Sequence, residues 1–188
     1  MPLKEKIEDC FHILFHYWKT DDNLKGTPER IAKMWEHEFI SHKTKPEMRT
    51  FKNRKYDEII MFDNIPFTGV CPHHLQPYQG KAWFLYIPNQ VVVGASKPAR
   101  LIDYYCSKTP ELHEDVGIQI MDDFIESVDP VGALLVMRAI HTCMACRGIK
   151  TGFSSGMTTS ISRGAFRDKL EVRLEAFSLI RFSQEVRI

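Results

Sequence analysis

The spacing of apolar residues predicts a helical first part of the chain. From Leu3 to Lys19, apolar side chains recur every three or four residues, which indicates an amphipathic helix. These side chains are Ile7, Phe11, Leu14, Phe15 and Trp18. A second helix is expected from Thr27 to about Phe39, with Thr27 as its N-cap and Pro28 in its first turn. The basic segment from Ser41 to Lys55 then predicts a solvated connecting loop.

From Ile59 onwards the pattern changes to that of strands joined by short turns. Antiparallel strands are expected at 59–62, 66–67, 80–88 and 91–95. An apolar run with several β-branched residues, from Val131 to Arg147, predicts a buried strand. The Ser/Thr-rich residues 154–162 predict an edge strand.

Helices are expected between and after these strands. Ser96 is the expected N-cap of a helix over 97–105, and a further helix over about 111–127 ends at Asp129-Pro130. Apolar residues from Leu170 to Ile180 keep helical spacing, although Glu171 to Leu174 also fits the start of a strand. Strands and helices in this arrangement predict an α+β fold.

Composition narrows the class of protein. The chain has 188 residues and a formal net charge of +1, so we expect one compact unit without a global field for nucleic acid or an anionic membrane. Five cysteines, an odd number, argue against a disulfide scaffold and for a reducing compartment. The first residues carry no apolar signal core, and no apolar run reaches membrane length. These features predict a cytoplasmic protein with no nucleic-acid or membrane partner.

Two clusters of metal-ligand residues stand far apart in the sequence. Cys71 and His74 are three residues apart in Cys71-Pro72-His73-His74, and the second cluster contains Cys143. Three protein ligands with an open fourth position are typical of a catalytic zinc. Cys71, His74 and Cys143 are therefore the expected ligands. His73 and His141 remain beside the metal as residues that titrate near neutral pH and suit acid–base chemistry.

The strand expected over 131–147 has a consequence for this site. Alternate residues of a strand share a face, so His141, Cys143 and Arg147 are expected to point the same way. A simpler interpretation also exists, because cysteines often fill core space, and Cys71 with Cys143 could form a disulfide.

A second constellation suits an anion. Ser96, Lys97 and Arg100 place a hydroxyl and two cations at the start of an expected helix, where free N–H groups favour negative charge. With Arg147, these cations could hold the phosphates of a substrate whose reactive carbon lies over the metal. The alternative is an ordinary exposed first turn. Glu114 could accept two N–H donors from a nucleobase edge, or serve only as a first-turn acid.

With these motifs in this order, the chain resembles the GTP cyclohydrolase I family, which has the tunnelling fold. The resemblance covers most of the chain and rests on Cys71-Pro72-His73-His74, Gly94-Ala95-Ser96-Lys97 and His141-Thr142-Cys143-Met144-Ala145-Cys146-Arg147-Gly148. It implies an antiparallel sheet with two packed helices, N-terminal helices over 1–55 and a catalytic domain over 56–188. It also implies that sheets of neighbouring subunits join into a barrel, usually in a homodecamer with active sites at subunit interfaces.

The resemblance implies a zinc enzyme that hydrolyses the imidazole ring of GTP and rebuilds it into 7,8-dihydroneopterin triphosphate with loss of formate. Cys71, His74 and Cys143 would hold Zn2+, and water activated there would attack C8 of guanine. His141 would give a proton to the ring nitrogen, and His73 would transfer protons at the ribose. Substrate contacts would come from Glu114 and the neighbouring His113 at guanine, Ser96 at the ribose, and Lys97, Arg100 and Arg147 at the triphosphate.

Two departures from the family pattern bear on the substrate. Pro72 stands where the family usually has a glutamate, so a partner that would orient the ligands is missing. Before Glu114 the family commonly has a glutamine, whereas this chain has His113. Two alternatives therefore stand beside the main hypothesis: an enzyme of the same fold acting on a related purine or pterin, and a non-catalytic metal-binding or pterin-binding subunit.

Overall fold

The computed structural model describes residues 2–17, 22–39 and 44–186. Its main element is a four-stranded antiparallel sheet in the order β2-β3-β5-β6, and a two-stranded sheet pairs β1 with β4. The strands are β1 (Thr50–Lys52), β2 (Ile60–Val70), β3 (Pro77–Ile87), β4 (Val91–Val93), β5 (Gly132–His141) and β6 (Met157–Gly164). The α-helices are α1 (Leu3–His16), α2 (Thr27–Met34), α3 (Lys97–Lys108), α4 (His113–Val128), α5 (Thr142–Ala145), α6 (Ala165–Asp168) and α7 (Leu170–Glu185). A 3-10 turn, η1 (Asp22–Leu24), precedes α2, and a π-helical turn, η2 (Trp35–Phe39), follows it.

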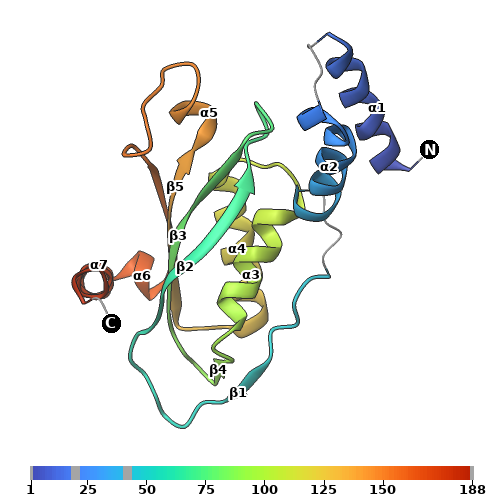
Figure 1. The fold of residues 1–188 in the computed structure, drawn as a ribbon. Coiled ribbons are helices and arrows are strands. Elements are labelled where there is room, and N and C mark those ends of the chain that lie inside the picture. The colour runs from blue at the N-terminus through green and yellow to red at the C-terminus, as the bar shows by residue number, and fades with distance from the viewer. Residues whose placement is uncertain (1, 18–21, 40–43, 187–188) are drawn as a thin grey trace.

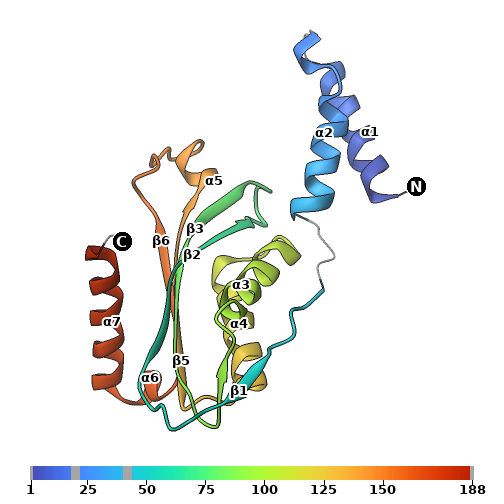
Figure 2. The same cartoon turned by 60° about the horizontal axis from the view of Figure 1, so that its bottom comes forward.

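Helices cover both faces of the larger sheet. Helices α3 and α4 lie on one face and α7 on the other, while α1 and α2 project away from this body (Figures 1 and 2). The sequence of β5 explains why the sheet has two covered faces. Leu135 and Met137 belong to the core under α3 and α4, whereas Leu134 and Val136 pack in the core under α7. A strand buried on both sides is apolar throughout, which is the pattern that identified it.

The direction of each element decides which residues share an end of the sheet. β2 and β5 run toward the loop that joins β2 to β3, and α4 begins at that end, so His113 and His141 lie near this loop (Figure 1). α3 follows β4 and begins at the opposite end. Eleven residues of β3 separate the two ends, which corresponds to roughly 35 Å of strand.

The helices and strands confirm most of the expected elements, including a helix rather than a strand at the C-terminus. Trp18 and Lys19 lie outside the described residues. One of the two capping expectations is wrong. Gly26, with a left-handed φ of 72°, is the N-cap of α2, so Thr27 is already helical. Ser96 is the N-cap of α3, as expected, but its side chain makes no capping hydrogen bond.

The segment before β2 is not the free loop that its charge predicted. Its residues 50–52 form β1, paired with β4. Lys45 also forms an ion pair of 2.7 Å with Asp123, a buried carboxylate on α4 that accepts further hydrogen bonds from Tyr105 and Ser127. The pairing of β1 with β4 and the ion pair between Lys45 and Asp123 therefore hold this segment against the rest of the structure. The division of the chain at residue 55 stays a prediction.

The expected strand over 131–147 was too long. β5 ends at His141 and the chain turns directly into α5, so Cys143 and Arg147 do not share a strand face with His141. The cause is the end of the neighbouring strand: Tyr78 opposite His141 is the last pair, and β3 begins at Pro77, just before it. The Thr142 hydroxyl donates to the Pro77 carbonyl at 2.6 Å and fixes the turn there.

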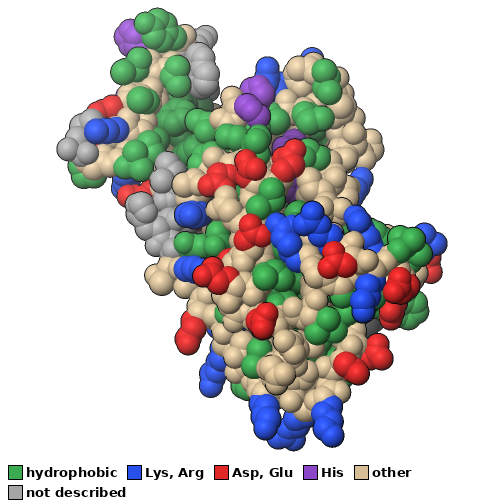
Figure 3. Space-filling model, turned by 180° about the vertical axis from the view of Figure 1, so that it is seen from behind, with side chains coloured by type: hydrophobic (Ala, Val, Ile, Leu, Met, Phe, Trp, Pro, Cys, Tyr) green, Lys and Arg blue, Asp and Glu red, His purple; other side chains and the backbone are tan. Residues whose placement is uncertain are grey.

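The surface agrees with the near-zero net charge. On the face that Figure 3 shows, basic and acidic side chains alternate over the body rather than separating into one basic surface. Within the part of the chain that the structure describes, none of the helices is both long and apolar enough to cross a membrane.

Gly80 is a point where β3 and β5 tolerate no side chain. A Cβ at Gly80 would lie 1.9 Å from the Arg138 carbonyl oxygen, whereas a Cβ at Gly94 would meet nothing closer than 3.6 Å. We expect Gly80→Ala to lower the free energy of unfolding by roughly 1–3 kcal/mol, because the strands must separate. Gly94→Ala is the matched control and should be nearly neutral. Urea unfolding of both variants measures the difference, and equal stabilities would contradict the close approach.

Candidate active site

The loop between β2 and β3 holds the first ligand cluster in a fixed turn. The Cys71 N–H donates to the Gln76 carbonyl, and the Leu75 N–H donates to the Cys71 carbonyl, both at 2.9 Å. Leu75 has a left-handed φ of 52°, which closes the loop tightly. Cys71 is buried, whereas His73 and His74 are exposed. The loop therefore presents two imidazoles above a sheltered thiol.

Cys143 reaches the same place from the end of β5, which pairs with the start of β3. The Sγ atoms of Cys71 and Cys143 and one ring nitrogen of His74 all lie within 4.8 Å of one another. Helix α5 makes this possible because it turns Cys143 back toward the loop. Both cysteines are free thiols, so the structure contradicts a disulfide between them. Two sulfurs and one imidazole nitrogen converging on one point form a donor set that fits a metal ion.

Charges around this cluster act on the Cys143 thiol. Burial raises its pKa, and the hydrogen bond with the Cys71 thiol adds to the rise, while the positive charge of Arg147 opposes it. Arg147 therefore lies close enough to influence the cluster although it is not on β5. The His73 Nδ1 atom lies 3.8 Å from the Cys71 sulfur, so this imidazole also borders the three possible ligands.

Next to the cluster, three polar aromatic side chains pack against one another. The rings of Tyr78 and His141 stack at 4.7 Å between centroids, and His113 lies 5.5 Å from Tyr78 and 5.8 Å from His141. Phe67 stacks on His113 at 5.7 Å. Tyr78 and His113 are each only 1% exposed. The three rings meet where β3, β5 and the start of α4 converge.

These rings carry buried polar atoms that lack hydrogen-bond partners among the described residues. They are the Tyr78 hydroxyl, the His141 Nε2 and both ring nitrogens of His113. Buried polar groups are usually paired, because leaving one unpaired costs about 1–3 kcal/mol. A concentration of such groups beside a metal-ligand cluster is typical of a site built to receive a polar ligand.

Burial also keeps both histidines neutral. It lowers the pKa of His113 to about 4; the neighbouring His141 adds to this shift and Glu114 opposes it. Burial likewise lowers the pKa of His141, again opposed by Glu114. Because Glu114 acts on both pKa values, its carboxylate lies close to both imidazoles. Glu114 is also exposed in the first turn of α4, so it is open to a ligand.

The structure does not bring the second constellation to this site within one chain. Ser96, Lys97 and Arg100 lie at the start of α3, at the far end of the sheet from Cys71 (Figure 1). A single substrate therefore cannot contact Lys97 and the metal-ligand cluster of the same chain. Arg147 is the only one of the three expected phosphate-binding cations that lies beside the cluster.

Tyr78 was not among the residues expected from the sequence. Its position in β3 gives it the helix-facing side, and a Cβ on Gly69 would lie 2.4 Å from its hydroxyl, so only glycine leaves it room. A strand tyrosine opposite a glycine was the available signal. The Gly69–Tyr78 pair indicates that the Tyr78 hydroxyl needs the space that glycine leaves, but it does not indicate which groups surround that hydroxyl.

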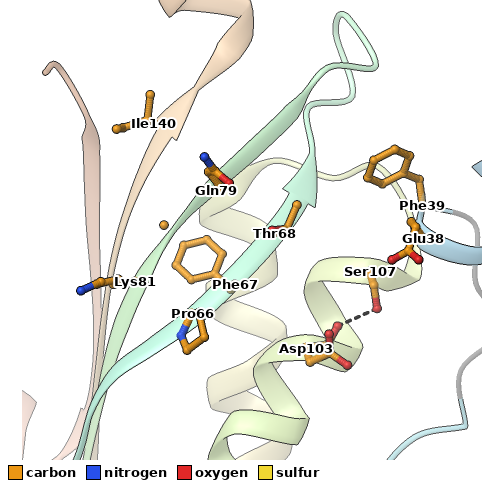
Figure 4. Close-up of a pocket in the computed structure, with 11 residues that line it drawn as sticks. Glu38, Phe39, Pro66, Phe67, Thr68, Gln79, Lys81, Asp103, Ser107 and Ile140 are labelled. Carbon is orange, nitrogen blue, oxygen red and sulfur yellow. Dashed lines mark hydrogen bonds between the residues drawn. The ribbon is translucent and has the colours of Figure 1, made fainter. Parts of the chain in front are cut away.

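A separate pocket of about 520 Å³ opens along the edge of β2. Figure 4 shows its lining: Glu38 and Phe39 from the end of η2, Phe67 and Thr68 from β2, and Asp103 and Ser107 from α3, where Ser107 donates to the Asp103 carbonyl at 2.6 Å. Phe67 belongs to both this wall and the stack on His113. Phe67 therefore separates this pocket from the His113 ring, and the pocket is lined by none of the three possible metal ligands.

Comparison with known protein families matches residues 5–181 to GTP cyclohydrolase I. The chain belongs to this family. Curated relatives named GTP cyclohydrolase 1 include that of Finegoldia magna, 38% identical over 94% of this chain and 98% of the relative. That of Pelotomaculum thermopropionicum is 39% identical over 85% and 86%, and that of Carboxydothermus hydrogenoformans 35% identical over 98% of both. Membership of the GTP cyclohydrolase I family confirms the resemblance carried by the three motifs.

Among solved structures, the archaeosine synthase QueF-Like in its apo form is similar to this chain. It is 14% identical, with a TM-score of 0.48, and the match covers 58% of this chain and 97% of that chain. A likeness of this size adds nothing to the family assignment.

Burial of His113 predicts an acid-sensitive fold. Between its ordinary pKa of 6.5 and its folded pKa of about 4, the unfolded chain binds a proton that the folded chain excludes. Stability should therefore fall as the pH drops from about 6.5 toward about 4. His113→Gln removes this contribution, so the loss between about pH 7.5 and pH 5 should be up to about 2 kcal/mol smaller than in wild type. Urea unfolding at both pH values tests this, and identical losses would refute it.

Proposed function

We propose that this protein is a GTP cyclohydrolase that opens the imidazole ring of GTP and forms 7,8-dihydroneopterin triphosphate with release of formate. The observation that carries the proposal is the convergence of two thiols and one imidazole beside His73 and His141, which are not among the three possible ligands. Family membership and the names of the curated relatives support the same chemistry.

Cys71, His74 and Cys143 would hold a zinc ion. The set of two sulfurs and one nitrogen fits zinc, and three protein ligands leave a coordination position for a reacting group. Zinc bound in this way supplies Lewis-acid activation of water. The exposure of His74 leaves the site open on the side from which a substrate would enter.

His141 and His73 would move the protons. His141 is held against Tyr78, and because its pKa is lowered, its protonated form is a strong donor to the guanine ring nitrogen that leaves carbon 8. His73 is exposed beside the Cys71 sulfur and would exchange protons at the ribose. An imidazole can both accept and donate a proton, which the multi-step reaction requires.

Glu114 and His113 would recognise guanine. The Glu114 carboxylate can accept the two N–H groups of the guanine edge, and His113 lies next to it with ring nitrogens that no described residue pairs. A neutral His113 can donate from one nitrogen and accept at the other. Its presence is the feature that keeps a related purine or pterin as the alternative substrate.

Ser96, Lys97 and Arg100 would act in the site of a neighbouring subunit. Their distance from the metal-ligand cluster within one chain rules out a shared substrate there, whereas a second copy could place them at the ribose and triphosphate, together with Arg147. β2 and β6 are the outer strands of the sheet, with unpaired edges available for joining sheets into a barrel. A decameric ring would satisfy both requirements.

The direct test is incubation of the metal-analysed protein with GTP, following formate release and pterin fluorescence after oxidation. We expect both products with about one zinc per subunit. Formate without pterin would indicate ring opening without rearrangement. Neither product in a zinc-loaded protein would reject the proposal and favour another purine substrate or a binding subunit.

Loss of the proposed proton donor should leave the metal site intact. We expect His141→Ala to lower the rate of formate release at least ~100-fold, because a positioned acid is removed. Zinc content should be unchanged, since His141 is not among the three ligands. His16→Ala, an exposed histidine on α1, is the control and should keep wild-type activity. Full activity of His141→Ala would exclude its catalytic role.

Mixed oligomers test the contribution of the neighbour. Cys143→Ala and Lys97→Ala should each be inactive alone, because each lacks one half of every site. Random mixing of the two subunits should restore up to about a quarter of wild-type activity, since one site in four combines two intact halves. No recovery in verified mixed oligomers would show that both halves belong to one chain.

A further inference from the structure

Two cations face each other on the side of the sheet that α7 covers. Lys81 on β3 and Arg138 on β5 are direct partners in the strand register, and both side chains are exposed. Like charges placed directly opposite each other destabilise a sheet. They lie on the opposite face from Tyr78 and His141, so the proposed reaction does not account for them.

Within the described ranges, neither cation forms an ion pair. The Lys81 ammonium donates only a long hydrogen bond of 3.4 Å to the Asn64 side-chain oxygen. Asp63 accepts from the Asn64 amide at 3.2 Å and is not among the residues that line the space between the cations. The positive charge is therefore left uncompensated by side chains.

These cations line an open pocket of about 760 Å³ between the sheet and the end of α7. The remaining polar lining is Asn64, Trp83, Ser183 and Gln184, with no carboxylate among the described lining residues. The C-terminal end of α7 contributes a partial negative charge of only about half a unit, against two full positive charges. The described lining residues therefore give the pocket a net positive charge.

Trp83, which lines the same pocket, provides an independent sign of a polar binding site. Its side chain is 6% exposed, and its Nε1 has no hydrogen-bond acceptor among the described residues. Asn64, another lining residue, has a left-handed φ of 51° at the register shift of β2 between Phe62 and Ile65. Such bulges redirect a side chain, and here the redirected amide lies against Lys81 in the pocket.

We propose that this pocket binds a phosphate-type oxyanion, held by Lys81 and Arg138. A phosphate group can accept from both cations at once, with the Asn64, Ser183 and Gln184 side chains as further polar partners. The site is separate from the triphosphate contacts assigned above, because it lies on the other face of the sheet. It would make the stability of the sheet depend on bound phosphate.

Thermal unfolding at constant ionic strength tests this site, with inorganic phosphate and tripolyphosphate as probes and chloride as the reference. We expect both probes to raise the Tm of wild type, and a larger effect of tripolyphosphate would indicate a ligand with a phosphate chain. Arg138→Glu should weaken the apparent affinity at least ~10-fold, since a charge-assisted bond is replaced by repulsion. Arg54→Glu, an exposed residue of the loop before β2, makes the same charge change and should respond like wild type.

A second variant separates this pocket from the proposed triphosphate site. Lys97→Ala combined with Arg147→Ala removes that site and should keep the phosphate-dependent Tm shift. Lys81→Gln provides a further loss-of-site variant if Arg138→Glu does not fold. The proposal is wrong if the shift disappears in the Lys97/Arg147 variant, or if Arg138→Glu and Lys81→Gln both respond like wild type.

Discussion

The pairing of β3 with β5 is the interaction on which the rest of the molecule depends. Its register places Tyr78 opposite His141 at one end and Lys81 opposite Arg138 on the other face. A slip of one residue would move every one of these side chains to the wrong face of the sheet. Apolar residues on both faces of β5 make such a slip costly, because two cores would lose their packing together. The loop with Cys71 enters β3 and Cys143 leaves β5, so this register also sets the three possible ligands against one another.

The aromatic cluster shows a conflict between stability and chemistry. Tyr78, His113 and His141 occupy positions where apolar side chains of similar size would fill the space without unpaired polar atoms. Each such atom costs folding free energy, and the neutral state of His113 costs more at acid pH. The large apolar cores on both sides of the sheet offset this cost. Groups held dry and unpaired need no rearrangement of water when a polar ligand arrives.

Much of this arrangement could be predicted from the sequence, and the failures have physical causes. The apolar run of β5 and the spacing of α4 identified both elements, and the ligand motifs predicted that Cys71, His74 and Cys143 come together, as they do in the structure. The helical turn at Cys143 was missed because Thr-Cys-Met-Ala continues a strand-like pattern. A hydrogen bond from Thr142 to Pro77, distant in the sequence, determines the turn. The position of Ser96 at the far end follows from alternating strand directions, which the pattern of apolar residues within each strand does not reveal.

Cys71 and Cys143 lie far apart in the chain, and this separation affects how the protein matures. Until β5 has paired with β3, this site offers only Cys71 and His74, two of the three donors that a zinc site of this kind uses. The third donor is synthesised after β2, β3, β5 and the helices α3 and α4. Metal capture at this site would therefore be a late event that selects chains whose central strands are already in register.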